Sequence, residues 1–271
     1  MGDGMTQSPA SRISRWPLPS HDDWSTPFAE VLLQQLDLRL GLRILDVACG
    51  HGIPAFHLAE QVGPTGTVVA IDASPGQVAN ARAIQGDELP WLSFQCLDLR
   101  VLPPSFPTFQ RITGNLSVMF FRPNRLKAVK GLIEHLEPGG QVVLTFPSLG
   151  TFDSIWQRID REMNAEGLTL ERERLAAHVA ERPSAKEAQG WLEQLEMERI
   201  AVVEQPLEVA SGAGQGFLQH PLLRGGFLDD AYECFADAKV ADKVMRRVSQ
   251  ELDSMRPLIA QRCALSGWKR Q

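Results

Sequence analysis

Short apolar runs alternate with helical periodicities along the first half of the chain. The apolar runs, most of which end at a glycine or an aspartate, predict strands at 43–49, 67–71, 91–97, 109–113 and 141–146. Apolar residues at helical spacing predict helices at 22–37, 53–62, 74–84 and 123–136. Strands that alternate with helices over short connections are typical of a parallel sheet covered by helices on both faces. The pattern therefore predicts an α/β fold.

Several of the predicted helix ends carry local signals. Pro54 suits the first turn of a helix that begins at Ile53, because proline is favoured at the first helical position. Ser74 is expected to cap the next helix, and Gln77 to close a capping box. The Pro-Gly-Gly run at 138–140 is expected to end the fourth helix.

The second half of the chain has a different pattern. It predicts helices at 150–166, 170–181, 184–195 and 229–255, and strands at 199–203 and 258–268. The polar start is expected to form a loose arm. We therefore predict an N-terminal arm and helix at 1–40, then one domain at 41–271 with cap segments at about 150–181 and 205–256.

Length, charge and cysteine spacing narrow the possible functions. The 271 residues are enough for a core without disulfide or metal staples. The net charge is −6 and the basic residues are scattered, which argues against a nucleic-acid partner. The cysteines lack metal-ligand spacing, so no metal site is predicted; they are Cys49, Cys96, Cys234 and Cys263. With no secretory leader and no apolar run near the roughly 20 residues of a membrane span, a cytoplasmic protein is expected.

Acidic and glycine residues gather where the first three predicted strands end. Asp46 precedes the glycine-containing segment Gly50–Gly52, and Asp72 and Asp98 follow the next two strands. Because the carboxyl ends of parallel strands meet at one edge of a sheet, these residues are expected to converge there. Asp72 can accept two hydrogen bonds from a ribose diol, Asp98 can accept one from an adenine amine, and Asp46 can pair with an ammonium group directly or through water. Glycines let the backbone approach such a ligand closely.

These motifs resemble those of class I S-adenosylmethionine-dependent methyltransferases. The Asp-Val-Ala-Cys-Gly-His-Gly segment at 46–52 is similar to the glycine loop of that family, Asp72 to its ribose-binding acid, and Leu97-Asp98-Leu99 to its adenine-binding stretch. The resemblance covers about 41–146 and resumes at 184–204. It implies a Rossmann-like, doubly wound sheet of seven strands, parallel except for an antiparallel last strand, with helical cap insertions. Within the family the chain looks most like small-molecule enzymes such as those of quinone biosynthesis.

The resemblance also implies a cofactor and its contacts. The cofactor would be S-adenosylmethionine, the product S-adenosylhomocysteine, and the methyl acceptor a small metabolite. Two family glycines are replaced here, by Ala48 and by Glu196, and His51 takes a position often held by Thr or Ser. The cofactor contacts implied by the resemblance are Asp46, Ala48, Gly50, His51, Gly52, Asp72, Ala73, Ser74, Gln77, Asp98, Leu99, Asn115 and Leu116.

Two other functions fit parts of the pattern. Residues 50–55 also satisfy the G-x-G-x-x-A pattern of dinucleotide-binding oxidoreductases, in which Asp72 would suit NAD. Such enzymes need no acid at Asp46, and the helix and strand at 184–203 favour the methyltransferase. A non-catalytic protein that binds S-adenosylmethionine or S-adenosylhomocysteine is the second alternative. The N/D-P-P-Y/F motif of methyltransferases that act on nucleobases or glutamine is absent.

No residue is identified by its pattern as a general base. The catalytic candidates are His51, His220 and Tyr232, with His21 and His178 in other segments that could cover the site. Asn115 and Ser117, after the fourth strand, are expected to contact the cofactor or the substrate. His57 and His135 are expected to be solvated on surface helices.

The cap segment at 205–256 mixes apolar residues with glycines. Its apolar residues include Phe217, Leu218, Leu222, Leu223 and Phe227. We predict that this segment folds over the cofactor crevice as a lid, and that the substrate is partly hydrophobic. No pattern predicts the oligomeric state.

Overall fold

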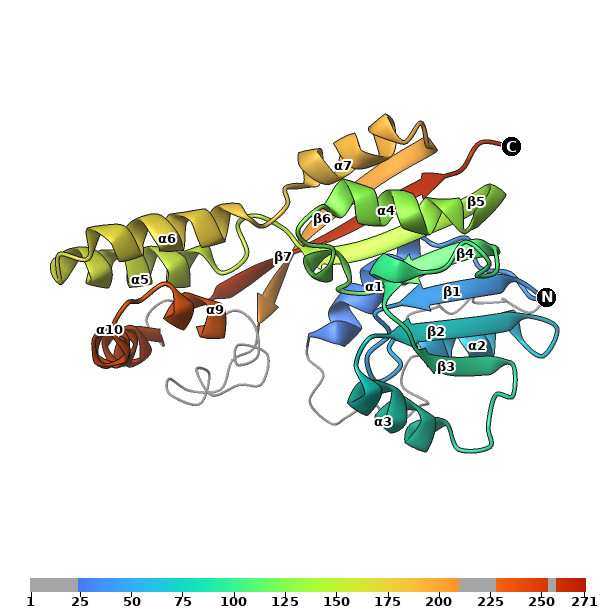
Figure 1. Cartoon of the computed structure of the whole chain (residues 1–271), viewed down its shortest axis with the longest axis horizontal. Coiled ribbons are helices and arrows are strands. Elements are labelled where there is room, and N and C mark those ends of the chain that lie inside the picture. The colour runs from blue at the N-terminus through green and yellow to red at the C-terminus, as the bar shows by residue number, and fades with distance from the viewer. Residues whose placement is uncertain (1–23, 210–227, 253–256) are drawn as a thin grey trace, which may run out of the picture. The chain divides into compact units, whose positions relative to one another are not determined.

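The computed structural model describes residues 24–209, 228–252 and 257–271, which form two compact units (Figure 1). The sheet unit comprises the chain up to Phe146 together with 185–204 and 262–271. The helical unit comprises 147–184 and 205–261. The predicted arm and the apolar cluster at 217–227 lie outside the described residues.

The sheet has seven strands in the order β3-β2-β1-β4-β5-β7-β6. The strands are β1 Arg43–Val47, β2 Thr67–Asp72, β3 Leu92–Cys96, β4 Phe109–Gly114, β5 Leu136–Pro147, β6 Glu198–Val209 and β7 Leu258–Trp268. Strands β3, β2, β1, β4 and β5 pair in parallel, and β7 is the antiparallel strand. The predicted doubly wound, seven-stranded sheet is confirmed.

Helices cover both faces of the sheet, and Figure 1 shows α4 and α7 on one of them. One face packs against α1 Ser25–Gln35, α2 Ala55–Val62 and α3 Pro75–Gln85. The other packs against α4 Arg125–Glu134 and α7 Ala185–Gln194. Successive strand residues alternate between the two cores: Ile44 lies in the first and Leu45 in the second, and Val143 and Val142 divide in the same way. Burial on both faces explains why these strands are continuous apolar runs.

The helical unit is built from α5 Asp153–Ala165, α6 Thr169–Ala180, α9 Leu228–Glu233 and α10 Ala238–Glu251. Helix α5 contacts both α6 and α10. Its buried Glu162 accepts hydrogen bonds from Arg158 at 2.5 Å and from Arg247 of α10 at 3.3 Å. No helix among the described residues is long and apolar enough to cross a membrane.

Three of the predicted helix boundaries were wrong. The single helix predicted at 229–255 is two helices, because Asp237 breaks the run and caps α10, accepting from the Lys239 N–H at 2.7 Å. Helix α4 ends at Glu134, and the Pro-Gly-Gly run at 138–140 lies inside β5, whose pairing with β4 already begins at Leu136. Helix α2 begins at Ala55, so Pro54 is its N-cap residue.

Two histidines were wrongly expected to be solvated. His57 is 3% exposed and His135 is 7% exposed. Nδ1 of His135 lies 3.2 Å from the Phe106 carbonyl oxygen, and its ring stands edge-on to the Phe106 ring. Helix α2 is buried around most of its circumference, and His135 is the C-cap residue of α4 rather than part of a solvated helix face.

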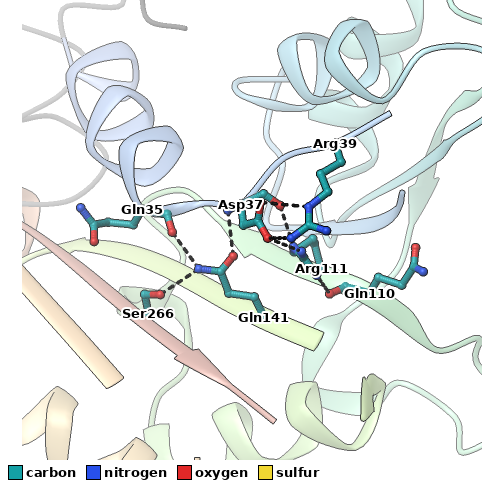
Figure 2. Close-up of polar contacts among 7 residues, drawn as sticks. All are labelled: Gln35, Asp37, Arg39, Gln110, Arg111, Gln141 and Ser266. Carbon is teal, nitrogen blue, oxygen red and sulfur yellow. Dashed lines mark hydrogen bonds and ion pairs between the residues drawn. The ribbon is translucent and has the colours of Figure 1, made fainter. Parts of the chain in front are cut away.

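Buried polar side chains fix the end of α1 to the sheet (Figure 2). Gln141 of β5 donates to the Gln35 carbonyl at 2.7 Å and to the Ser266 hydroxyl at 3.1 Å. Its Oε1 accepts from the Asp37 N–H at 2.9 Å. One side chain thus joins the end of α1 to β5 and β7.

Arg111 of β4 makes a second connection in the same network (Figure 2). Its guanidinium donates to the Asp37 carbonyl at 2.8 Å, to the Asp37 carboxylate at 3.1 Å and to the Gln110 carbonyl at 2.8 Å. Arg111 is 5% exposed, so these bonds compensate a nearly buried charge. Arg39, which is exposed, binds the same carboxylate at 2.6 Å.

Candidate functional site

The structure brings Asp46, the loop that follows β1 and Asp72 together at the carboxyl edge of the sheet. The Gly50 N–H donates to Oδ2 of Asp72 at 2.8 Å, and the Ser74 N–H donates to Oδ1 at 2.8 Å. Asp72 therefore ties the loop after β1 to the turn that opens α3.

Asp46 lies at the base of this site. Its side chain is fully buried, opposite Ala70 of β2 and Thr113 of β4. The Thr113 hydroxyl donates to Oδ1 at 2.7 Å, whereas Oδ2 has no hydrogen-bond partner among the described residues. Burial raises the pKa of Asp46 to about 7; the bond from Thr113 opposes this rise and the charge of Asp72 adds to it.

The loop after β1 uses left-handed backbone conformations. Ala48 has a φ of 52°, Gly50 of 53° and Gly52 of 108°. A Cβ on Gly52 would lie 2.3 Å from Cε2 of Phe56, whereas a Cβ on Gly50 would meet no atom within 4 Å. Gly52 is thus required by packing, and Gly50 leaves open space where a ligand could approach the backbone.

Asp72 retains capacity to bind a ligand. Each carboxylate oxygen offers about two acceptor positions, and each oxygen of Asp72 accepts one backbone hydrogen bond. Ser74 caps α3 by accepting from the Gln77 N–H at 3.4 Å. One free position on each oxygen suits a vicinal diol, the group that Asp72 is predicted to bind.

Asp98 forms an ion pair with Arg100, which the sequence analysis did not predict. Oδ1 accepts from the N–H and from Nε of Arg100 at 2.9 Å each, and Oδ2 accepts from Nη2 at 2.6 Å and from Nε at 3.1 Å. These bonds hold the pKa of Asp98 below its usual value. They also fill its acceptor positions, so an adenine amine could bind Asp98 only after the exposed Arg100 side chain moves.

The segment after β4 is held by protein contacts. Asn115 donates to the Ser25 carbonyl at 2.9 Å and accepts from the Thr145 hydroxyl at 2.8 Å. The Leu116 N–H donates to the same hydroxyl at 2.9 Å, and Leu116 has a φ of 54°. Ser117 is buried and donates to the Gly114 carbonyl at 2.9 Å. Asn115 therefore also fixes the first turn of α1.

The catalytic candidates fall in different parts of the chain. His51 is half-buried in the loop after β1. Tyr232 on α9 and His178 on α6 belong to the helical unit, where the His178 ring stands edge-on to Trp156. His21 and His220 lie outside the described residues.

Two threonines of the site were not identified from the sequence. Thr113 and Thr145 are fully buried, and each hydroxyl donates to a predicted site residue, Asp46 and Asn115 respectively. A polar residue in an otherwise apolar strand was the available signal, because a buried hydroxyl requires a partner.

The residues present fit S-adenosylmethionine. The unpartnered Oδ2 of Asp46 suits a cationic amino group, Gly50 leaves open space beside the loop, and Asp72 keeps acceptor positions for a ribose. Among the described residues no group of His, Cys, Asp and Glu side chains could hold a metal ion.

Comparison with known proteins agrees with this geometry. Residues 44–140 match the model of the methyltransferase domain family. The YcgJ protein from Bacillus subtilis shares the fold, with a TM-score of 0.56 at 17% identity over 90% of this chain and 99% of that chain. The chain thus has a Rossmann-like fold, and its residues 44–140 match a methyltransferase domain. Over residues 44–140 the chain is similar to class I S-adenosylmethionine-dependent methyltransferases.

Two relatives are similar to the same part of the chain. Aklanonic acid methyltransferase DauC of Streptomyces sp. (strain C5) is 33% identical over 135 residues, which are 48% of this chain and 60% of that protein. The tRNA (guanine(6)-N2)-methyltransferase of Thermus thermophilus is 33% identical over 159 residues, which are 53% of this chain and 45% of that protein. The chain thus spans about half the length of these relatives.

Proposed function

We propose that this protein transfers the methyl group of S-adenosylmethionine to a small, partly hydrophobic metabolite. The observation that carries the proposal is the convergence of Asp46, the 48–52 loop and Asp72 at one sheet edge. This edge lies inside the segment that matches the methyltransferase domain family.

In this proposal each part of the site has a separate task. Asp72 would bind the ribose hydroxyls, and Asp46 would face the ammonium group. The backbone of the 48–52 loop would lie against the ligand. When bound, the cofactor supplies an activated methyl group on a sulfonium centre. The protein would then contribute mainly alignment of the acceptor and exclusion of water.

Charge and chain composition support a small acceptor. The net charge is −6 with scattered basic residues, whereas nucleic-acid-binding faces are basic. The two relatives are named for different acceptors, aklanonic acid in one and tRNA in the other. The apolar residues of the 205–256 segment support a partly hydrophobic substrate.

A general base is needed only when the acceptor is a poor nucleophile. His51 is placed in the sheet unit beside the predicted cofactor residues, and Tyr232 in the helical unit. Both remain candidates in this proposal, because a carboxylate, thiolate or phenolate acceptor would need neither.

The proposal is tested by methyl transfer to a metabolite extract. The protein is incubated with S-adenosylmethionine that carries a deuterated methyl group, and labelled products are identified by mass spectrometry. We expect labelled small molecules with wild-type protein and much less label with Asp72→Ala, which loses the ribose contact. A protein that binds S-adenosylhomocysteine but labels nothing would instead support the non-catalytic alternative, and labelled RNA would overturn the small-molecule assignment.

A further inference from the structure

Asp46 is an incompletely satisfied buried acid. Among the described residues its Oδ2 is the one buried carboxylate oxygen without a hydrogen-bond partner. Its other oxygen accepts a single bond, from Thr113 at 2.7 Å. A buried carboxylate normally needs a cation or several donors, so this arrangement is incomplete for the charged form.

Among the described residues, no cationic side chain bonds to the Asp46 carboxyl group. On β2, Asp72 carries the same sign of charge and disfavours ionisation of Asp46. In the loop, burial raises the pKa of the Cys49 thiol, and the charges of Asp46 and Asp72 raise it further, so this thiol stays neutral. The other titratable or charged side chains on the surrounding elements are His51 in the loop, His57 and Glu60 on α2, Glu30 on α1, Arg43 on β1 and Arg111 on β4.

Thr113 makes the site suitable for both protonation states. Its hydroxyl donates to Oδ1 whether Asp46 is a carboxylic acid or a carboxylate, so it fixes the orientation of the group. Oδ2 is then the atom that either carries a proton or faces a cationic ligand. Thr113 is therefore a positioning residue for Asp46.

We infer that Asp46 and Thr113 form a proton-linked subsite for a ligand ammonium group, in which Asp46 is a neutral acid when the subsite is empty and releases its proton to solvent when the cation binds. The inference rests on the proposed function, because that function supplies the ligand, the α-ammonium group of S-adenosylmethionine or S-adenosylhomocysteine. The proton leaves Oδ2, and the resulting carboxylate pairs with the ammonium group.

The pH dependence of binding follows from this exchange. Only the carboxylate form accepts the ammonium group, so affinity rises with pH until Asp46 is ionised in the empty protein. With a pKa of about 7 for Asp46, binding should be about 20-fold weaker at pH 5.5 than at pH 7.5. An α-amino group has a pKa of about 7.7–8.0, so the ligand is nearly all ammonium at pH 5.5 and still mostly ammonium at pH 7.5, and its own titration reduces the rise only slightly.

The test is calorimetric titration with S-adenosylhomocysteine at pH 6.5 in two buffers that differ in ionisation enthalpy. The difference in heat gives the number of protons released. We expect roughly three-quarters of a proton per ligand with wild-type protein. The control ligand is 5′-methylthioadenosine, which has the same nucleoside and thioether but no amino-acid tail, and it should release none.

Two variants separate the proton linkage from general damage to the site. Asp46→Asn should bind S-adenosylhomocysteine more weakly, release no proton and show affinity that does not change between pH 5.5 and 7.5. Thr113→Val should still release a proton, with the affinity rise moved to higher pH because the carboxylate loses its donor.

Three results would overturn the inference. Binding without proton release by the wild type, or the same release by Asp46→Asn, would contradict it while leaving the proposed function intact. Failure of S-adenosylhomocysteine to bind the wild type at any pH would overturn the proposed function and the inference with it.

Discussion

Ala48 and Glu196, at two positions where the family has glycine, share one backbone conformation. Their φ angles are 52° and 53°, which lie in the left-handed region. A residue with a Cβ pays about 1–2 kcal/mol there, whereas glycine does not. Gly50, in the same loop as Ala48, has a φ of 53° and keeps the family residue. The resemblance identified these positions from sequence, and the structure supplies the reason for the family preference.

Reciprocal substitutions test this reasoning. Ala48→Gly and Glu196→Gly should each raise the free energy of unfolding by about 1 kcal/mol, and Gly50→Ala should lower it by a similar amount. Urea unfolding of the three variants measures the changes. A loss of stability in Glu196→Gly, which lies outside the predicted cofactor contacts, would contradict the conformational explanation.

The elevated pKa of Asp46 makes stability depend on pH. Because the folded pKa of about 7 lies above the ordinary value of 3.8, folding favours the protonated acid, and this stability is lost as pH rises from about 4 to about 7. Asp46→Asn removes the titration and keeps an acceptor for Thr113. The stability of the variant relative to wild type should therefore grow by about 2–3 kcal/mol between pH 5 and pH 8, measured by urea unfolding at both pH values. An unchanged difference would show that Asp46 is not protonated in the fold.

At the scale of elements, apolar runs predicted the strands because those strands are buried on both faces. Residues 258–268 were predicted as a strand and are β7. Element ends were less predictable where tertiary pairing decides them: β5 begins at Leu136 because β4 pairs with it there. The break before α10 depends on Asp237, whose capping role the apolar spacing at 229–255 does not reveal.

The network at the end of α1 could not be predicted from sequence. Gln141 joins Gln35 and Ser266, which lie 106 and 125 residues away in the chain. No local pattern reports such pairings. The same reason explains why the bonds from Thr113 and Thr145 to predicted site residues were missed.

Asp37 offers a direct test of this network. Asp37→Ala leaves the nearly buried Arg111 without its carboxylate, although two carbonyl partners remain, so stability should fall by about 2 kcal/mol. The matched control is Arg39→Ala, which removes an exposed partner of the same carboxylate and should cost less than about 0.5 kcal/mol. Thermal unfolding distinguishes the two variants. Equal losses would show that the buried pair contributes nothing beyond a surface ion pair.

At the scale of the whole molecule, every predicted cofactor residue lies in the sheet unit. His178 and Tyr232 lie in the helical unit, and the lid function of the 205–256 segment stays a prediction. Sequence resemblance predicts the cofactor residues because their chemistry follows strand ends. It could not place the acceptor contacts, which depend on segments with no shared motif.

This division predicts how variants affect cofactor binding. His178→Ala and Tyr232→Phe should leave the affinity for S-adenosylhomocysteine within about twofold of wild type. Asp72→Ala should weaken binding at least about tenfold, because it removes charge-assisted hydrogen bonds to the ribose. Calorimetric titration of each variant gives the affinities. Strong weakening by Tyr232→Phe would place part of the cofactor site in the helical unit.

The most direct test of the central claim is calorimetric titration of the wild-type protein at pH 7.5 with S-adenosylhomocysteine and, separately, with NAD. A class I methyltransferase site built on Asp46, the 48–52 loop and Asp72 predicts saturable binding of S-adenosylhomocysteine and no binding of NAD. Binding of NAD in the absence of any S-adenosylhomocysteine binding would contradict the account.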